Sequence, residues 1–321
     1  MFPNTNDPTY GIFVKEQIDA IRTHEDIDYD VYVINGKRGY QEYLKSIFRI
    51  RSFVRNGGYD LIHIHYGLSG LFLLFGKPAV PVIMTLHGGD IQAEQGRMVQ
   101  VELTKCILRR CDYVITLNER MDELVRRYVE KSEIIPCSVN MRFFVPISKE
   151  KERTGKIKVL FPSARSRKVK DYPLFKRTCE VLRDEYGLDV EEFYLEDLSR
   201  KEVAKLFKEV DLLLMTSISE GSPQVVKEAM ACNLPVVSTN VGDVALLLEG
   251  VRDCYVAESR DEKLLAALAY KSLAKKHKIG MSPIEKLKEL GLDDDHVAWR
   301  LLKVYHDLIK SIQKCKLSGV K

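Results

Sequence analysis

The chain has 321 residues, of which 45% are hydrophobic and 30% charged, and its 50 basic against 46 acidic residues give a net charge of +4. This length suits two domains of about 150 residues each, and the near balance of charge argues against a nucleic-acid-binding protein. The seven cysteines are odd in number, scattered and never spaced as Cys-x-x-Cys, which indicates a reducing compartment rather than disulfides or a zinc site.

The chain opens on a turn-like stretch, FPNTNDPTYG, which is followed directly by a helical pattern, IFVKEQIDAIRTH. The stretch lacks the basic region and the apolar core of a secretory signal, so we expect a cytoplasmic protein. A doubly wound domain ordinarily begins with a strand, and that first strand is missing from the pattern. Two explanations stay open: the strand is absent, or the polypeptide begins upstream of Met1.

A second helical pattern, residues 44–58, interleaves apolar residues with four basic ones. Such a helix suits an anionic membrane surface. An ordinary domain helix with a solvated basic face explains the same pattern, so both interpretations stay open.

Short apolar runs that alternate with helical patterns predict parallel sheets built from βαβ units. In the first half of the chain the expected strands are residues 60–66, 80–87, 113–118 and 132–139. The most apolar region, 66–86, is interrupted by Gly-Lys-Pro at 76–78 and by Pro81, whereas a membrane-spanning helix needs about 20 uninterrupted apolar residues.

A polar segment, 146–156, is expected to be a linker. After it the same rhythm restarts, with expected strands at residues 157–163, 189–195, 211–217 and 235–240. We predict two doubly wound α/β domains, 1–148 and 149–321, with a ligand site in the cleft between them. Neither a Gly-x-Gly-x-x-Gly fingerprint nor a P-loop occurs, so a dinucleotide-dependent oxidoreductase has little support.

Two glutamates mark the junction of an expected strand and helix, SISEGSPQVVKEAMACNLPVV at 217–237. Ser222 is expected to cap the helix and Pro223 to take its first position, which would leave free N–H groups for a phosphate. Glu220 would precede the helix, and Glu228 would lie roughly 7–8 Å along its axis. The two carboxylates would then meet different parts of one ligand rich in hydroxyl groups. The competing interpretation is that Glu220 supports the helix dipole and Glu228 is solvated.

The run SEGSPQVVKEAMACNLPVVSTNVGD resembles the donor-binding signature of retaining glycosyltransferase family four, the glycosyl transferases group 1. Its hallmark is a pair of glutamates separated by seven residues, here Glu220 and Glu228. Other segments, such as TLHGGDI and FPSARSRKVKDYPLF, resemble further parts of these enzymes in the same order. The resemblance implies the GT-B fold, with two Rossmann-like domains facing across a cleft, and a C-terminal helix at about 294–313 that packs back on the first domain.

In that family the first glutamate lies near the transferred sugar and the second binds the nucleotide ribose. The resemblance carries these roles to Glu220 and Glu228, and it places the turn residues Gly221, Ser222 and Pro223 at the nucleotide.

Arg167 and Lys170 match the positions that bind the donor phosphates, with Arg165 and Lys168 as competitors. Charge-assisted hydrogen bonds of this kind contribute about 1.5–3 kcal/mol each. A solvated basic loop is the alternative.

The resemblance also implies that His87 contacts the donor sugar and that Asp90 shapes its loop. Gly11 matches the glycine at which the backbone approaches the donor phosphates, although the strand that would support this loop is missing. His63 and His65 lie at period two on an expected strand, and we interpret both as structural. A metal site built on these histidines is the alternative and has little support, because no carboxylate or cysteine stands at ligand spacing.

One loop departs from the family pattern. Ser138, within PCSVN, replaces a glycine that relatives more often carry, so this loop is expected to bend differently.

The implied function is retaining transfer of a sugar from a nucleotide diphosphate sugar to a saccharide or lipid-linked acceptor, in surface glycan or polysaccharide synthesis. Neither a metal nor a further cofactor is expected. The protein would be cytoplasmic, with contact to the inner face of the cell membrane through 44–58 as an open alternative. A degenerate, non-catalytic GT-B protein that binds a sugar nucleotide or a partner enzyme is the rival hypothesis, and a nucleotide-sugar epimerase of the same fold is a third.

Overall fold

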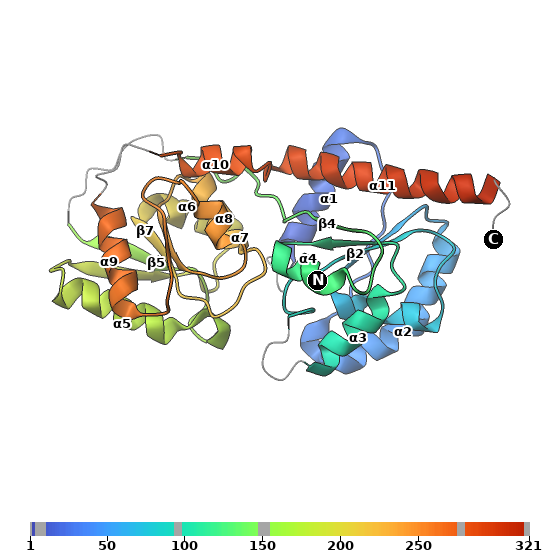
Figure 1. Ribbon diagram of the computed structural model, residues 1–321, viewed down its shortest axis with the longest axis horizontal. Coiled ribbons are helices and arrows are strands. Elements are labelled where there is room, and N and C mark those ends of the chain that lie inside the picture. Colours follow the sequence, from blue (N-terminus) through green and yellow to red (C-terminus); the bar gives the residue numbers. More distant parts are fainter. Residues whose placement is uncertain (1, 4–10, 93–97, 147–154, 275–279, 318–321) are drawn as a thin grey trace. The chain divides into compact units, whose positions relative to one another are not determined.

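The structure is a computed structural model that describes residues 2–3, 11–92, 98–146, 155–274 and 280–317. It divides into two compact units, Met1–Cys137 with Asp295–Lys321, and Ser138–Asp294. Each unit is a parallel sheet with helices on both faces (Figure 1). No helix among the described residues is long and apolar enough to cross a membrane.

The predicted boundary between 148 and 149 lies outside the described residues, but the chain enters unit 2 earlier than we expected. Val139 forms a parallel bridge with Asp293, and Phe144 is completely buried in a core of unit 2. The domain boundary therefore moves to 137/138, because the residues that follow already pack in the second unit.

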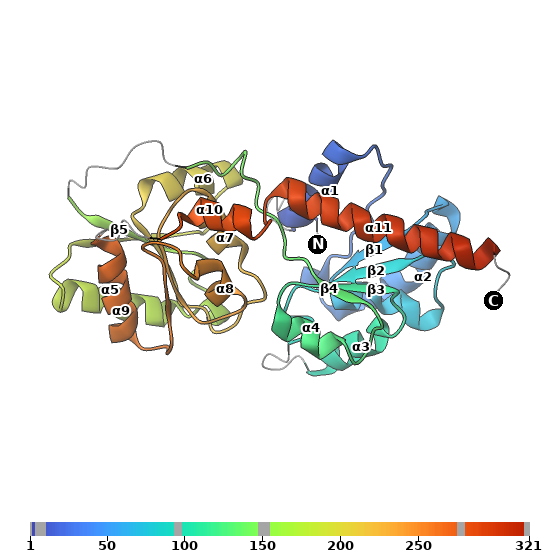
Figure 2. The same ribbon diagram turned by 45° about the horizontal axis from the view of Figure 1, so that its top comes forward.

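Unit 1 holds a four-stranded sheet whose order follows the chain, β1-β2-β3-β4 (Figure 2). Every pair is parallel. The strands are β1 (Ile62–His65), β2 (Val82–Thr85), β3 (Tyr113–Thr116) and β4 (Ser132–Ile134). Its helices are α1 (Ile12–His24), η1 (Gly36–Arg38), α2 (Tyr40–Gly57), η2 (Gly67–Phe75), α3 (Met98–Leu108), α4 (Glu119–Val125) and α11 (Asp294–Leu317). Each predicted strand of this half contains an observed one.

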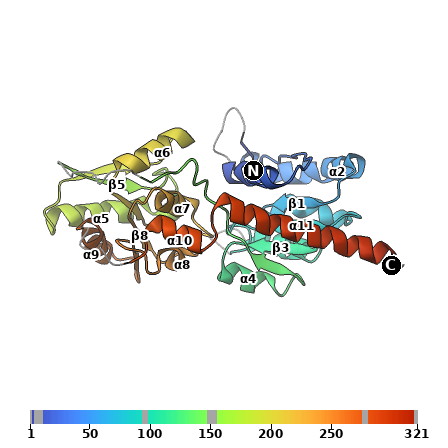
Figure 3. The same ribbon diagram turned by 90° about the horizontal axis from the view of Figure 1, so that it is seen from above.

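The C-terminal helix packs on unit 1. Ala298 and Leu301 of α11 share a core with Ile21 of α1 and with Ile83 and Ile115 of the sheet. Figure 3 shows α11 along the sheet of unit 1. Neighbouring strand residues, such as Met84, face the opposite core, as the period of two requires.

Between residues 11 and 61 the structure has helices and no strand, whereas residues 4–10, just ahead of the first helix, lie outside the described residues. Residues 26–35 are extended without strand pairing. Ile34 is buried in the core of unit 1, whereas Val31 and Val33 are exposed. β1 consequently has β2 as its only neighbour among the described strands.

Unit 2 holds a five-stranded parallel sheet of order β6-β5-β7-β8-β9. Its strands are β5 (Ile157–Phe161), β6 (Val190–Tyr194), β7 (Leu212–Met215), β8 (Val236–Thr239) and β9 (Tyr255–Ala257), of which β9 was not predicted. Its helices are η3 (Lys168–Lys170), α5 (Tyr172–Asp184), α6 (Arg200–Glu209), α7 (Gln224–Ala231), α8 (Val244–Leu248), α9 (Glu262–Leu273) and α10 (Pro283–Glu289). The chain runs from β5 to β6 on one side and then crosses to β7 on the other, so the strand order reverses between β5 and β7.

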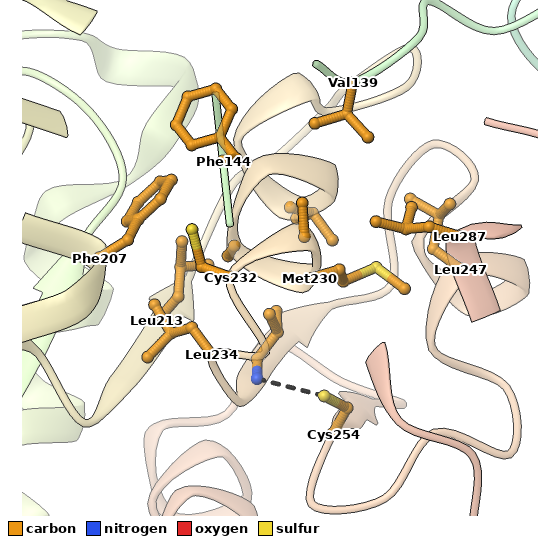
Figure 4. Packing of buried hydrophobic residues seen from close by; sticks show 14 of the residues in the cluster. Val139, Phe144, Phe207, Leu213, Met230, Cys232, Leu234, Leu247, Cys254 and Leu287 are labelled. Atoms are coloured by element: carbon orange, nitrogen blue, oxygen red, sulfur yellow. Dashed lines mark hydrogen bonds between the residues drawn. The ribbon is translucent and has the colours of Figure 1, made fainter. Parts of the chain in front are cut away.

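The core of unit 2 under α7 includes two cysteines that behave as small hydrophobic residues (Figure 4). Burial raises the pKa of Cys232 and of Cys254 to about 12, so both stay protonated at neutral pH. The Cys254 sulfur accepts a hydrogen bond of 3.4 Å from the Val236 N–H. Cys106, Cys111 and Cys179 are free thiols as well.

Candidate functional site

The site residues of unit 2 follow strands β5 and β7, which are hydrogen-bonded neighbours. In an open α/β sheet, ligands bind beyond the carboxyl ends of the strands where the strand order reverses. Lys170 follows β5 and Glu220 follows β7, so the two residues lie at this switch point.

Lys170 and Glu220, fifty positions apart in sequence, form a close ion pair. The Ser217 hydroxyl donates a second hydrogen bond of 2.7 Å to the same Glu220 oxygen. The two loops are also joined through their backbones, because the Thr216 hydroxyl donates to the Lys170 carbonyl at 3.0 Å and the Ile218 N–H donates to a neighbouring carbonyl at 2.8 Å. Glu220 is therefore anchored as a carboxylate by a largely buried lysine.

The other basic residues of this loop lie elsewhere. Arg165 pairs with Glu196 at 3.0 Å and lies over the Tyr194 ring, 4.8 Å from its centre. Arg167 and Lys168 are exposed. The structure thus brings Lys170, but not Arg167, against the first glutamate.

Glu228, on α7, is buried, with 4% of its surface exposed. It forms a close ion pair with Arg200 at the start of α6, and the Arg200 guanidinium lies 4.7 Å from the centre of the Phe144 ring. The interpretation of Glu228 as a solvated helix residue is wrong, because its carboxylate is buried and paired.

The predicted cap of α7 is wrong. The helix begins at Gln224, one residue later than expected, and its N-cap is Pro223, which offers no side-chain hydrogen bond. The Ser222 hydroxyl instead donates to Asp243 at 2.6 Å and accepts from the completely buried Lys227 at 3.1 Å. The Ser222 hydroxyl therefore bonds Asp243 and Lys227 instead of capping α7.

The turn after β7 packs tightly on the turn after β8. Gly242 adopts a left-handed conformation with φ of 59°, and a Cβ built there would lie 2.4 Å from the carbonyl oxygen of Gly221. A side chain at Gly242 would therefore displace the loop that carries Glu220.

Three buried polar atoms on the segments after β5, β7 and β8 have no hydrogen-bond partner among the described residues. They are Ser163 Oγ, Gln224 Oε1 and Asp243 Oδ1. Burial also raises the pKa of Asp243, although the Lys227 charge opposes the shift. Because buried polar atoms are nearly always paired, these atoms indicate a place for a polar ligand or water at this edge of the sheet.

In unit 1, Asp90 organises the loop after β2. Its completely buried carboxylate accepts hydrogen bonds from the His87 N–H at 3.0 Å and from the Gly67 N–H at 3.1 Å. Burial raises the pKa of Asp90 to about 6. The geometry agrees with a loop-shaping role for this residue.

Three histidines form a row that includes His87. His63 lies within hydrogen-bonding distance of Tyr305 at 2.6 Å and of Thr85 at 2.7 Å, and its ring stacks on His65 with centroids 4.4 Å apart. His65 Nδ1 lies 3.2 Å from His87 Nε2. Burial lowers the pKa of His63 to about 4 and that of His87 to about 3, so both rings are neutral at pH 7. Among the residues that the structure describes, no group of three or more potential ligands is placed to hold a metal ion.

Gly11 is the N-cap of α1 and has φ of 70°, a conformation that favours glycine. The ring of Phe13, in the first turn of the same helix, lies 4.9 Å from the His87 ring. Gly11 and His87 therefore belong to one neighbourhood of unit 1, while 4–10, the rest of the predicted phosphate loop, lie outside the described residues.

A polar cavity of about 230 Å³ in unit 1 is lined by residues that the sequence analysis did not single out, including Tyr40, Tyr43, Tyr66 and Gln100. Gln100 is 4% exposed, and its amide donates to the Tyr66 hydroxyl at 2.7 Å and to a carbonyl of the His87 loop at 3.0 Å. Tyr66 itself has φ of 79°, which is rare for a bulky residue and is found at binding sites more often than elsewhere.

Two family models match the chain in order. Glycosyltransferase Family 4 matches residues 14–143, and Glycosyl transferases group 1 matches residues 176–274. The chain belongs to this glycosyltransferase family.

Curated relatives of the family are distant. A D-inositol 3-phosphate glycosyltransferase of Paenarthrobacter aurescens is 27% identical over 63% of this chain and 61% of its own length. A probable sucrose-phosphate synthase of Thermosipho melanesiensis is 23% identical over 72% of this chain and 66% of its own length. The chain thus spans about two thirds or less of the length of these relatives.

Solved structures establish the GT-B fold. Sucrose-phosphate synthase from Thermosynechococcus elongatus superposes with a TM-score of 0.75 at 18% identity, over 97% of this chain and 96% of that one. Anabaena Alr3699/HepE in complex with UDP and glucose gives a TM-score of 0.63 at 14% identity, over 87% and 84%.

Sequence reasoning missed Lys227 and Asp243 within the family motif, and Arg200 outside it. Arg200 lies in SRKEVAK, whose only readable signal is the capping box between Ser199 and Glu202. Lys227 reads as an ordinary helix residue between the two glutamates. Asp243 is the last residue of the motif, and no pattern in the sequence indicates its contact with Ser222.

Proposed function

We propose that this protein is a retaining glycosyltransferase that moves a sugar from a nucleotide diphosphate sugar to a hydroxyl of a saccharide or lipid-linked saccharide, in surface glycan or polysaccharide synthesis. The observation that carries the proposal is the pairing of Glu220 with Lys170 at the switch point of unit 2, together with the buried pair of Glu228 and Arg200. The relatives named D-inositol 3-phosphate glycosyltransferase and probable sucrose-phosphate synthase support it, and HepE, solved in complex with UDP and glucose, supports the class of donor.

Glu228 is proposed to bind the nucleotide ribose. An ionised carboxylate only accepts hydrogen bonds, and the ribose hydroxyls are donors. Arg200 offsets the cost of burying this charge, because breaking such a pair would leave an uncompensated ion in the interior.

Glu220 is proposed to hold hydroxyls of the transferred sugar, with His87 contacting the same sugar. Lys170 and Arg167 would stabilise the departing nucleoside diphosphate, together with backbone N–H groups near Gly221 and Ser222, whereas Pro223 has no N–H to offer. Positive groups aimed at developing charge lower the barrier, and Lys170 is the buried cation of this loop. No metal takes part in this proposal, and no protein nucleophile is assigned.

The cavity lined by Tyr40, Tyr43, Tyr66 and Gln100 is proposed to receive the acceptor. Tyrosine rings with a fixed amide beside them suit a ring-shaped, hydroxyl-rich molecule, since the rings cover its apolar face and the amide and phenol groups bond its hydroxyls. The hydrogen bond from Gln100 to the His87 loop links this cavity to the proposed sugar-binding residue.

Helix α2 is proposed to touch an anionic membrane surface, where a lipid-linked acceptor would be found. Tyr40, Leu44 and Phe48 recur every four residues and are exposed, Phe48 by 74%, and Phe75 lies beside Phe48 with ring centres 6.4 Å apart. Exposed basic side chains of the same helix complement an anionic lipid surface. In liposome flotation, we expect binding to anionic vesicles that weakens at high salt and is lost in Phe48→Ser. Absence of binding to anionic lipid at low salt would remove this part of the proposal.

The donor site is tested by calorimetric titration with UDP, GDP and ADP. We expect saturable binding of one of them by the wild type, loss of that binding in Glu228→Ala, and no change in Glu209→Ala, which removes an exposed glutamate of α6. Binding that survives in Glu228→Ala would contradict the assigned role. If none of the three binds, the non-catalytic hypothesis replaces the proposed one, and transfer that releases free nucleoside diphosphate excludes an epimerase.

A further inference from the structure

The contact between His65 and His87 restricts both rings. His65 Nδ1 and His87 Nε2 are 3.2 Å apart, and the rings are nearly parallel, with centroids 5.5 Å apart. A neutral imidazole has one N–H donor and one acceptor nitrogen, so one ring must donate to the other.

The two possible directions lead to a simple rule. If His65 donates from Nδ1, the acceptor Nε2 of His87 is unprotonated and the His87 proton is on Nδ1. If His87 donates from Nε2, the acceptor Nδ1 of His65 is bare and the His65 proton is on Nε2. In both cases the two rings carry their proton on the nitrogen of the same name, so the tautomer of one ring fixes that of the other.

The surroundings hold this pair in place. His63 stacks on the His65 ring, and its own two nitrogens are occupied by Tyr305 and Thr85. Tyr305 comes from α11, so the C-terminal helix supports the row. His87 is held by Phe13 against its ring and by the Asp90 carboxylate at its backbone N–H.

We propose that His65 is a positioning residue for His87: it determines which nitrogen of His87 carries the proton, and therefore whether Nδ1 of His87 meets its ligand as a donor or as an acceptor. The identity of that ligand as the donor sugar rests on the proposed function. The coupling of the two tautomers does not.

The coupling is tested by NMR of the full chain labelled with 15N in its histidines, using long-range correlations that report the tautomer of each ring. Two variants separate the ring from the hydrogen bond. His65→Phe keeps an aromatic ring between His63 and His87 and removes the bond, whereas His65→Asn places an amide near the position of Nδ1 and keeps a bonding group. His306→Phe, which alters an exposed histidine of α11 paired with Glu25, is the control.

We expect the same tautomer in His65 and His87 of the wild type, a mixture of tautomers for His87 in His65→Phe, and a single tautomer in His65→Asn and His306→Phe. Where transfer is measurable, kcat should fall about tenfold in His65→Phe, with KM for the donor changed much less, and should recover largely in His65→Asn. Different tautomers in the two wild-type rings, or unchanged His87 nitrogen shifts in His65→Phe, would overturn the proposal. If the tautomers follow the rule but no nucleotide binds, the proposed function fails and the positioning role of His65 stands.

Discussion

The pair formed by Arg200 and Glu228 offers a quantitative test of the donor site. Both side chains are largely buried, with exposed fractions of 18% and 6%. Replacing Arg200 by leucine leaves the Glu228 carboxylate buried without its partner, and breaking such a pair costs about 3–5 kcal/mol. Replacing both residues by leucine removes the two charges together, which is often nearly neutral. We therefore expect the double variant to be more stable than Arg200→Leu.

The assay is urea unfolding followed by far-ultraviolet circular dichroism, on the wild type, the two single variants and the double variant. The matched control is the cycle of Lys205→Leu and Glu209→Leu, an exposed pair 3.8 Å apart on the same helix, for which a coupling energy below about 1 kcal/mol is expected. Coupling between Arg200 and Glu228 that is as small as in the control would refute the reasoning. Nucleotide binding by the double variant at wild-type affinity would also refute it, since the ribose would then not need the Glu228 carboxylate.

Three further results are expected. Glu220→Gln should lower kcat far more than it weakens nucleotide binding, whereas Glu228→Ala should weaken binding directly, and equal effects of both substitutions on both quantities would contradict the assignment. Burial raises the pKa of Asp90 from 3.8 to about 6, so its contribution to folding is fully present below pH 3.8 and is lost as the pH rises through 6. Asp90→Asn should accordingly gain up to about 3 kcal/mol in unfolding free energy relative to the wild type between pH 4 and pH 7.5, measured in urea, and an unchanged difference would refute this. Gln100→Leu should raise the acceptor KM about tenfold with the donor KM unchanged, and an equal rise in both would show that the cavity is not specific to the acceptor.

The fold was largely predictable because buried parallel strands are short apolar runs. Residues 211–217 and 235–240 could be recognised as strands without knowing their neighbours, since a strand covered on both faces needs apolar residues at nearly every position. β9, Tyr255–Ala257, has three residues and no such run, so it carried no readable signal.

The site was predictable where topology alone brings residues together. Lys170 and Glu220 meet because they follow adjacent parallel strands, which the strand order dictates. The partner of Glu228 was not predictable, because the approach of Arg200 depends on how α6 packs beside α7. The predicted cap of α7 was wrong for the same reason. Ser222 has a hydroxyl suited to a cap, and only the packed structure shows that this hydroxyl donates to Asp243.

Each glutamate of the motif is paired with a cation in the structure, Glu220 with Lys170 and Glu228 with Arg200. A diphosphate that binds Lys170 must compete with Glu220 for the same ammonium group, because the lysine is paired in the structure. When the phosphate binds Lys170 in place of Glu220, the Glu220 carboxylate is left without its cation. The hydroxyls of the attached sugar can then donate hydrogen bonds to it. Phosphate binding to Lys170 and sugar binding to Glu220 are then coupled. It follows that Glu220→Gln, which frees Lys170 from its carboxylate, should leave nucleoside diphosphate binding unchanged or tighter while turnover falls. Weaker nucleoside diphosphate binding in Glu220→Gln would show that the ion pair supports the phosphate site rather than competing with it.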